Sequence, residues 1–280
     1  MKAKQTNALA TLLLWLAALA IVGILAWFLI FILGRGLPVL GPQFFTGPNG
    51  VGGQFFNSFY ILFLSLVFSL PVGVGAGIYL AEYAPKNRLT DVMRLSTESL
   101  ATVPSIVLGL FGMIIFVNVF KLGFTILGGA ATLALLNLPV LVRVTEESLR
   151  NVPASYREAS LALGATMWQT LRKVILPTAL PGLVTGTTLV AGRALGETAI
   201  LIFTAGMSVS RHLFDLRLTA PGETLAVHLY AVQANPLPGT HAGRVANGTA
   251  ALLVLVALAF NLLLALPSRW LQHRLSGKRG

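Results

Sequence analysis

Six long apolar segments constrain this chain more than any other feature of its sequence. The first, residues 8–33, contains no charged residue, and a helix needs about 20 apolar residues to cross the hydrocarbon core of a bilayer. Of the 280 residues, 55% are hydrophobic and 10% are charged, whereas soluble domains carry about 25% charged residues. So few charges cannot cover a water-facing surface, and the sequence therefore predicts a protein dissolved in lipid.

The segments predict an all-α, polytopic membrane protein with six transmembrane helices. After the first, we expect spans at about residues 57–81, 100–120, 124–142, 176–204 and 245–267. The first segment is longer than the apolar region of about 7–15 residues in a secretory signal, and no cleavage site follows it. It ends in Gly34-Arg35, so we interpret it as a retained span.

The basic residues fall unevenly on the two sides that these spans create. If the N-terminus is cytoplasmic, the outer side holds only Arg35, Lys121, Arg211, Arg217 and Arg244. The inner side then holds Lys2, Lys4, Lys86, Arg88, Arg94, Arg143, Arg150, Arg157, Arg172, Lys173, Arg269, Arg274, Lys278 and Arg279. Cytoplasmic loops are enriched in Lys and Arg, so we expect both termini inside. This topology, rather than nucleic-acid binding, accounts for the net charge of +11.

Two segments predicted on the outer side are rich in turn residues. Residues 34–56 include Pro38, Pro42 and Pro48, and residues 205–244 include Pro221, Pro236 and Pro238. Both are candidate contact surfaces for an external partner, and both could equally be plain connections.

A charged, helix-prone stretch separates the fourth and fifth spans on the predicted inner side. Residues 155–173 are mostly good helix formers, and Gly164 permits a sharp change of direction. We expect two short helices joined at Gly164. Glu158 is placed in the first turn of the first helix, where a carboxylate suits the helix dipole, and Pro177 marks the start of the next span.

Such a compact knob could seat in a groove on a partner and convert the partner's motion into tilting of the attached helices. The side chains expected to touch that groove are Leu161, Leu163, Met167, Trp168 and Leu171. The alternative is an amphipathic helix resting on the membrane surface. No Gly-x-x-x-x-Gly-Lys-Ser/Thr loop occurs in the chain, so nucleotide phosphates have no such cradle here.

Arg193 and Glu197 are charges inside the fifth span. A charge at the centre of a membrane helix costs about 2.5–3.5 kcal/mol on insertion scales, and i, i+4 spacing would put both on one helix face. Gly192 and Gly196 share that spacing and would let another helix approach closely. The alternatives are an anion pathway and a structural ion pair that ties helices together.

In the anion-pathway interpretation, the guanidinium of Arg193 offers a planar fork that fits tetrahedral oxyanions. Glu197 would either neutralise Arg193 between transport events or accept the proton of a protonated oxyanion, which would favour phosphate over sulfate.

Prolines interrupt several spans, and Thr102-Val103-Pro104-Ser105 is the most informative interruption. Irregular backbone at membrane depth is tolerated where it faces protein or a wet cavity. The hydroxyls of Thr102 and Ser105 could therefore line a passage, together with that of Thr198, although a simple packing kink is an equal alternative.

Catalytic and metal sites are not indicated. The chain has no cysteine, and His212, His228, His241 and His273 are scattered, so neither a metal site nor a nucleophile–base arrangement is predicted. We expect no cofactor bound by this chain.

The knob resembles the EAA loop of bacterial ABC importer permeases, which docks into an ATPase subunit in that family. The pattern reads Glu-Ala-Ala, three residues, Gly, nine residues, Ile, one residue, Leu-Pro. Glu158, Ala159, Gly164, Leu176 and Pro177 match it, Ser160 replaces the second alanine, and Val174 takes the isoleucine position.

A wider resemblance points to the phosphate ABC transporter permeases, and within them to the PstA type. It is carried by residues 77–84, 98–112 and Gly-Arg-Ala-Leu-Gly-Glu-Thr-Ala at 192–199, with residues 45–48 and 176–186 typical of PstA. The similarity covers roughly residues 40–270. The departures are mild: Ser160 replaces alanine, and residues 199–201 read Ala-Ile-Leu where Ala-Pro-Leu is common.

The resemblance implies a MetI-like permease fold in a bacterial inner (plasma) membrane. Residues 1–56 would form the first helix and outer loop, 57–270 the permease core with its coupling loop at 145–178, and 271–280 a cytoplasmic tail. It implies a second permease of the PstC type, a dimer of PstB-type ATPases that bind ATP and Mg, and a periplasmic PstS-type phosphate-binding protein. Alternatives are a permease for molybdate or sulfate, and a secondary transporter driven by an ion gradient.

Overall fold

The computed structural model describes residues 2–47, 50–209, 213–234 and 242–275, with side chains described from residue 3 to residue 264 of these ranges. Within this part of the chain the backbone forms helices and no strand, apart from one isolated antiparallel bridge between Val209 and Gly222. The all-α prediction is confirmed. Pro48, Arg211, His212, Pro236, Pro238 and His241 lie outside the described residues.

Five long helices are apolar enough to cross a membrane by length and composition, and they correspond to five of the expected spans. They are α1 (Lys2–Gly36), α3 (Gly52–Ile78), α6 (Ile126–Arg150), α9 (Leu176–Leu195) and α12 (Ala242–Leu275). Short elements join them at the two ends of the bundle: η1 (Leu37–Val39), α2 (Pro42–Thr46), α7 (Ala154–Ala162), α8 (Met167–Thr170) and α11 (Leu225–Ala234).

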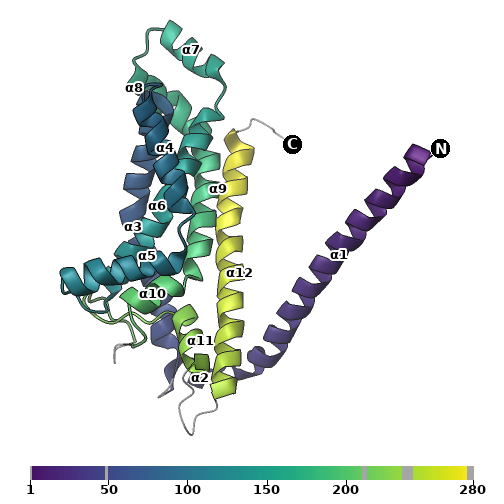
Figure 1. The fold of residues 1–280 in the computed structure, drawn as a ribbon, viewed down its shortest axis with the longest axis vertical. Coiled ribbons are helices and arrows are strands. Elements are labelled where there is room, and N and C mark those ends of the chain that lie inside the picture. The colour runs from purple at the N-terminus through teal and green to yellow at the C-terminus, as the bar shows by residue number, and fades with distance from the viewer. Residues whose placement is uncertain (1, 48–49, 210–212, 235–241, 276–280) are drawn as a thin grey trace.

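The third expected span, residues 100–120, is wrong as a single helix. Helix α4 (Arg88–Ala101) and helix α5 (Ser105–Gly112), which continues into the π-helix η3 (Met113–Val119), meet at an angle of 97°. The bend falls at Pro104, which has no amide hydrogen and disfavours a helical conformation for the residue before it. This bent pair is either a broken span or a re-entrant loop, and it makes a sixth crossing only in the first case. Helix α5 lies across the bundle in Figure 1.

The fifth expected span, residues 176–204, is also interrupted. Helix α9 ends at Leu195, residues 196–198 are not helical, and the short helix α10 (Ala199–Thr204) follows. Gly196 caps α9 with φ −93° and ψ 3°, and glycine is the residue that weakens a helix interior most after proline.

Helix α6 is the centre of the bundle, with 67% of its apolar window buried. Glycines on its neighbours let it approach closely: a methyl group added at Gly73 of α3 would lie 2.7 Å from the Cβ of Leu141. One added at Gly182 of α9 would lie 2.7 Å from the Oγ of Ser148. Small residues at helix contacts are how membrane helices gain packing without a hydrophobic driving force.

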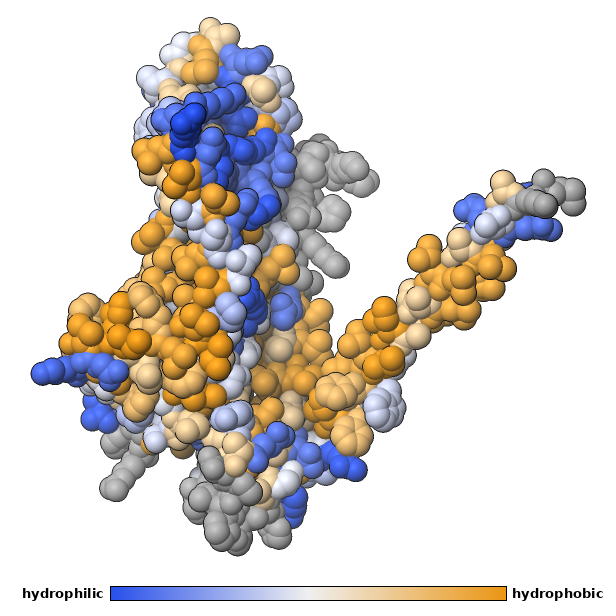
Figure 2. Space-filling view, viewed as in Figure 1, coloured by the Kyte–Doolittle hydropathy of each residue, from blue (hydrophilic) through white to orange (hydrophobic). Residues whose placement is uncertain are grey.

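The two ends of the bundle differ in composition and in the elements they carry. Figure 1 shows α7 and α8 at one end, with the start of α1 on the same side, and α2 and α11 at the opposite end. Figure 2 shows polar residues gathered near the α7 end and apolar residues over the middle of the bundle and over α1. Helix α1 stands away from the bundle, and none of its apolar window is buried.

Two π-helices lie beneath α7 and α8. The π-helix η2 (Tyr79–Tyr83) continues α3, and η4 (Leu171–Ile175) leads into α9. Pro177 has no amide hydrogen to donate to the carbonyl of Lys173, which explains why regular α-helical bonding fails just before it. Single-turn π segments of this kind occur often at functional sites.

The close contact of α3 with α6 makes a testable prediction. Replacing Gly73 with Leu should lower the free energy of unfolding by about 1–3 kcal/mol, because the new side chain must displace Leu141. The same substitution at Gly75, where an added Cβ meets nothing within 4 Å, should change it little. Thermal unfolding of the two purified variants in detergent checks this, and equal melting temperatures would contradict it.

Candidate functional site

The loop between α6 and α9 forms a compact knob, defined here as residues 154–170. Helix α7 ends at Ala162, and the chain reverses at Gly164, whose φ of +84° is a conformation that glycine adopts without strain. Helix α8 then begins with a capping box: the Gln169 amide donates to the Thr166 hydroxyl, and the Thr166 amide donates to the Gln169 side chain at 2.9 Å. The predicted pair of short helices joined at Gly164 is confirmed.

Ser160, the residue that departs from the family pattern, has a structural role in the knob. Its hydroxyl lies 2.9 Å from the hydroxyl of Thr170, and this hydrogen bond joins α7 to the end of α8. An alanine at the same position could not make the bond. The departure therefore adds a contact inside the knob.

The surface of the knob carries large apolar side chains that are open to solvent. Leu163 is 89% exposed and Trp168 is 60% exposed, and Leu161, Met167 and Tyr156 are also exposed. An exposed apolar patch bordered by polar residues is typical of a surface that meets another protein or a membrane. Tyr156 was not among the predicted contacts, although it lies one turn before Ser160 in the same short helix.

Leu171 corrects the predicted set of docking side chains. It is 3% exposed and belongs to an apolar cluster beneath the knob, which also contains Leu149, Val152, Ile175 and Ala179. Val174 and Leu176 are half-buried and pack against the same cluster. Leu171, Val174 and Ile175 lie in η4, which follows α8 directly. The sequence of residues 155–173 therefore could not show which apolar side chains face outward and which face inward.

Glu158 is exposed, but its predicted place at the start of the helix is wrong. Helix α7 begins at Ala154, and its first turn contains no acidic residue. Within the described residues Glu158 forms no hydrogen bond or ion pair that holds it to the knob. Glu158, Ala159 and Gly164 thus lie on the open side of the knob, and Pro177 lies exposed in the first turn of α9.

The second candidate region surrounds the two helix breaks. Helix α5 packs on α10: a methyl group added at Gly109 would lie 3.1 Å from the carbonyl oxygen of Ala199 and from the Cα of Ile200. Farther along, Phe116 and Thr204 both lie beside Gly128. The two segments therefore run in the same direction, and their starting ends, at residues 102–105 and 196–199, lie at the same end of the contact.

The predicted pathway residues fall around these two breaks, with different degrees of exposure. Arg193, in the last turn of α9, and Thr102 are exposed, while Ser105, Glu197 and Thr198 are half-buried. The hydroxyl of Thr102 donates to the Ser99 carbonyl at 2.7 Å, and that of Thr198 donates to the Gly196 carbonyl at 3.3 Å.

The predicted placement of Arg193 and Glu197 on one helix face is wrong. Because α9 ends at Leu195, the two residues are not one helical turn apart, and among the described residues they form no ion pair with each other. Gly192 does allow a close helix contact, since a methyl group there would lie 2.6 Å from the Asn261 side chain of α12. Gly196 meets no other helix so closely.

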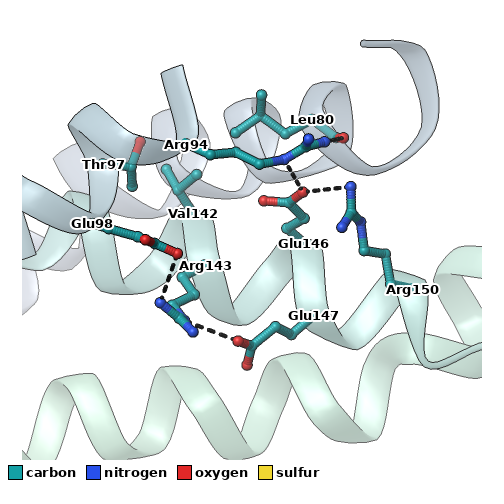
Figure 3. A pocket seen from close by; sticks show the side chains of 9 residues that line it. All are labelled: Leu80, Arg94, Thr97, Glu98, Val142, Arg143, Glu146, Glu147 and Arg150. Carbon is teal, nitrogen blue, oxygen red and sulfur yellow. Dashed lines mark hydrogen bonds and ion pairs between the residues drawn. The ribbon is translucent and has the colours of Figure 1, made fainter. Parts of the chain in front are cut away.

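A charged pocket of about 190 Å³ between α4 and α6 was missed by the sequence reasoning. Figure 3 shows its ion pairs: Glu146 accepts from Arg94 at 2.8 Å and pairs with Arg150 at 2.9 Å, and Arg143 joins Glu98 at 3.1 Å to Glu147 at 2.9 Å. Three arginines and three glutamates balance one another, so the pocket fixes α4 against α6. The i, i+4 spacing of Arg143 with Glu147 and of Glu146 with Arg150 could have predicted the ion pairs along α6.

At the opposite end, residues 213–225 are partly packed and partly exposed. Gln54 of α3 donates to the buried Glu223 at 3.0 Å, and the Tyr60 hydroxyl donates to the Leu216 carbonyl at 3.0 Å. Phe214 and Leu216 are nevertheless 69% and 66% exposed. Beside them, Asp215 raises the pKa of Arg217 by a hydrogen bond and by its charge. This segment is thus held to α3 by hydrogen bonds and exposes the apolar side chains of Phe214 and Leu216.

Comparison with known proteins adds independent findings. Residues 73–277 match the family model described as "Binding-protein-dependent transport system inner membrane component". Among solved structures, a chain of the MetNI methionine ABC transporter superposes with a TM-score of 0.64 at 22% identity, covering 82% of this chain and 98% of that one. A chain of a bacterial alginate ABC transporter gives a TM-score of 0.63 at 15% identity, covering 95% and 96%. At these identities the likeness concerns the fold.

Curated relatives are more similar in sequence. The "Probable ABC transporter permease protein YqgI" of Bacillus subtilis is 43% identical, over 97% of this chain and 96% of its own length. The "Phosphate transport system permease protein PstA" of Haemophilus influenzae is 35% identical, over 89% and 88%. "Phosphate transport system permease protein PstA 2" of Mycobacterium bovis is 33% identical, over 89% and 82%.

The division of the knob into outer and inner side chains makes a prediction. Replacing the buried Leu171 with Ala should lower the free energy of unfolding by about 2–5 kcal/mol, because it leaves a cavity in the cluster beneath the knob. Replacing the exposed Leu163 with Ala should change it by about 0.5 kcal/mol or less. Thermal unfolding of both variants measures this, and a larger loss for Leu163→Ala would contradict the assignment.

Proposed function

Because the chain belongs to the family of binding-protein-dependent transport system inner membrane components, we propose that it is the transmembrane permease subunit of an ATP-driven importer of inorganic phosphate. The family and the apolar helices make it a multi-pass membrane protein and a transport subunit. The proposal that the substrate is phosphate rests on the similarity to phosphate transport permeases named PstA, one of which is 35% identical over 89% of this chain.

The knob is the proposed point of contact with the ATPase. Its helices are internally braced by the Ser160–Thr170 hydrogen bond and by the capping box of α8, while Leu163 and Trp168 project outward. A rigid element with an apolar surface suits seating in a groove of another subunit. In this proposal the knob lies in the cytoplasm, both termini lie on the same side, and ATP and Mg are bound by the partner.

The broken helices are the proposed phosphate pathway. Non-helical backbone at membrane depth is tolerated where it is buried in protein or lines a wet cavity, and both breaks lie at one end of the α5–α10 contact. Arg193 is exposed and has no ion pair with Glu197, so its guanidinium is not neutralised by that carboxylate. A charged fork at this place could pair with a tetrahedral anion as it passes.

The transport cycle then follows from these two regions. ATP binding would close a pair of PstB-type ATPases and move the knobs of this chain and of a PstC-type permease toward each other. The helix bundles would rock from inward-facing to outward-facing, and a PstS-type binding protein would release phosphate into the opening. Arg193 would guide the anion along the interface between the permeases, and Glu197 could accept a proton from it.

Uptake of radiolabelled phosphate by the reconstituted complex tests the proposal. ATP should be required, and an excess of sulfate or molybdate should not compete. Arg193→Gln should reduce uptake by roughly 10- to 100-fold, since a hydrogen bond to a charged group contributes about 1.5–3 kcal/mol. Arg88→Gln, which removes an exposed arginine at the start of α4, is the matched control and should leave uptake unchanged. Normal uptake by Arg193→Gln would contradict the pathway, and uptake that needs only an ion gradient would contradict the ATP-driven cycle.

A further inference from the structure

A partly buried ion pair fastens the knob to a helix distant in the sequence. Arg157 of α7 donates through its Nε to both carboxylate oxygens of Glu82, at 3.2 Å each, and its Nη2 also bonds to the Oε1 of Glu82. Glu82 belongs to η2, the π-helix that ends α3, and its side chain is 5% exposed. The fork of the guanidinium fits a carboxylate and fixes the direction of the contact as well as its position.

The same arginine also closes the end of α6. Its Nη1 donates to the Val152 carbonyl at 2.8 Å, and its Nη2 donates to the Leu149 carbonyl at 2.7 Å. The last carbonyls of a helix lack partners within the helix, and a cation beside them suits the negative end of the helix dipole. One side chain thus connects α7, the end of α6 and the end of α3.

The π-helix η2 is also held from its other side. Arg94 of α4 donates to the Leu80 carbonyl at 3.1 Å and to Glu146 of α6 at 2.8 Å. Ile78 and Ala81 pack on the apolar cluster beneath the knob, beside Leu149 and Leu171. The end of α3 is therefore fixed to α4, α6 and the base of the knob at once.

The knob would be a looser element without the Arg157–Glu82 contact. Along the chain it is attached at only two places, to α6 through residues 151–153 and to α9 through η4. A body attached at two points can rotate about the line that joins them. The ion pair supplies a third attachment, to a helix that lies 75 positions earlier in the sequence.

We propose that Glu82 and Arg157 are positioning residues that transmit movement of the knob to α3 and α6. The inference rests on the proposed function, because it assumes that a partner moves the knob. It assigns to these two side chains a role distinct from docking: the open residues of the knob engage the partner, and the Arg157–Glu82 ion pair passes the displacement on. Loss of the pair would let the knob turn while α3 stays behind.

The test compares ATP hydrolysis with phosphate uptake in the same proteoliposomes, made from the full complex. Glu82→Gln and Arg157→Gln should leave hydrolysis within about twofold of the unmodified complex while uptake falls roughly tenfold or more, because the ion pair is lost when either partner is removed. Asp91→Asn is the matched control: Asp91 also pairs with an arginine, at 3.7 Å from Arg94, but its side chain is 75% exposed. It should leave both rates unchanged.

A cross-link separates transmission from folding. The chain has no cysteine, so the double variant Glu82→Cys with Arg157→Cys carries the only two thiols in this subunit. It should hydrolyse ATP with little uptake, and a bis-maleimide linker of matching length, added after purification, should restore uptake. A linker added to the purified complex cannot repair a failure to fold, so recovery would show that the connection itself is what uptake requires.

Two results would overturn the inference. One is an unchanged ratio of uptake to hydrolysis in Glu82→Gln and Arg157→Gln. The other is a parallel loss of assembly, hydrolysis and uptake that the linker does not restore. Failure of the proposed function would look different, because the unmodified complex would itself show no ATP-driven phosphate uptake.

Discussion

The close packing of α6 against α3 and α9 is the contact on which the rest of the structure depends. The apolar window of α6 is 67% buried, against 33% for those of α3 and α9 and 22% for that of α12. Lipid offers no hydrophobic driving force between helices, so the contact relies on close backbone approach at positions such as Gly73 and Gly182. Both candidate regions are attached to this core: the knob continues from the end of α6, and α5 and α10 pack beside its first half.

The two regions differ in the way they are held, and this difference fits the roles proposed for them. The knob is braced internally by Ser160 and fastened to η2 by Arg157, so it can be moved as one piece. The helix breaks are fixed through backbone contact of Gly109 with residues 199 and 200, and they leave Arg193 exposed. A rigid knob, joined through the bundle to a helix break beside an exposed arginine, suits the coupling of a partner's motion to the passage of an anion.

The spans and the two-helix knob could be predicted from the sequence, because the length of an apolar run and the position of a glycine act on the local backbone. An uncharged run such as residues 8–33 must cross or lie in lipid. Gly164, between two helix-prone stretches, has a φ of +84° and reverses the chain there, as its position predicts. The errors came from features that depend on three-dimensional packing. Leu171 and Leu163 are equally apolar, and only the fold shows that one is buried. The end of α9 at Leu195 separates Arg193 from Glu197, and the Arg157–Glu82 pair joins residues too far apart for any local pattern to reveal.

The most direct test of the account concerns which face of the membrane carries the knob and what covers it there. In this cysteine-free chain, Leu163→Cys places a single thiol at the most exposed of the knob's large apolar positions, and its reaction with a membrane-impermeant maleimide can be followed in vesicles of either orientation. Labelling should occur in inside-out vesicles and fall sharply when the ATPase subunits are bound. Labelling in right-side-out vesicles, or labelling that the ATPase does not affect, would contradict the account.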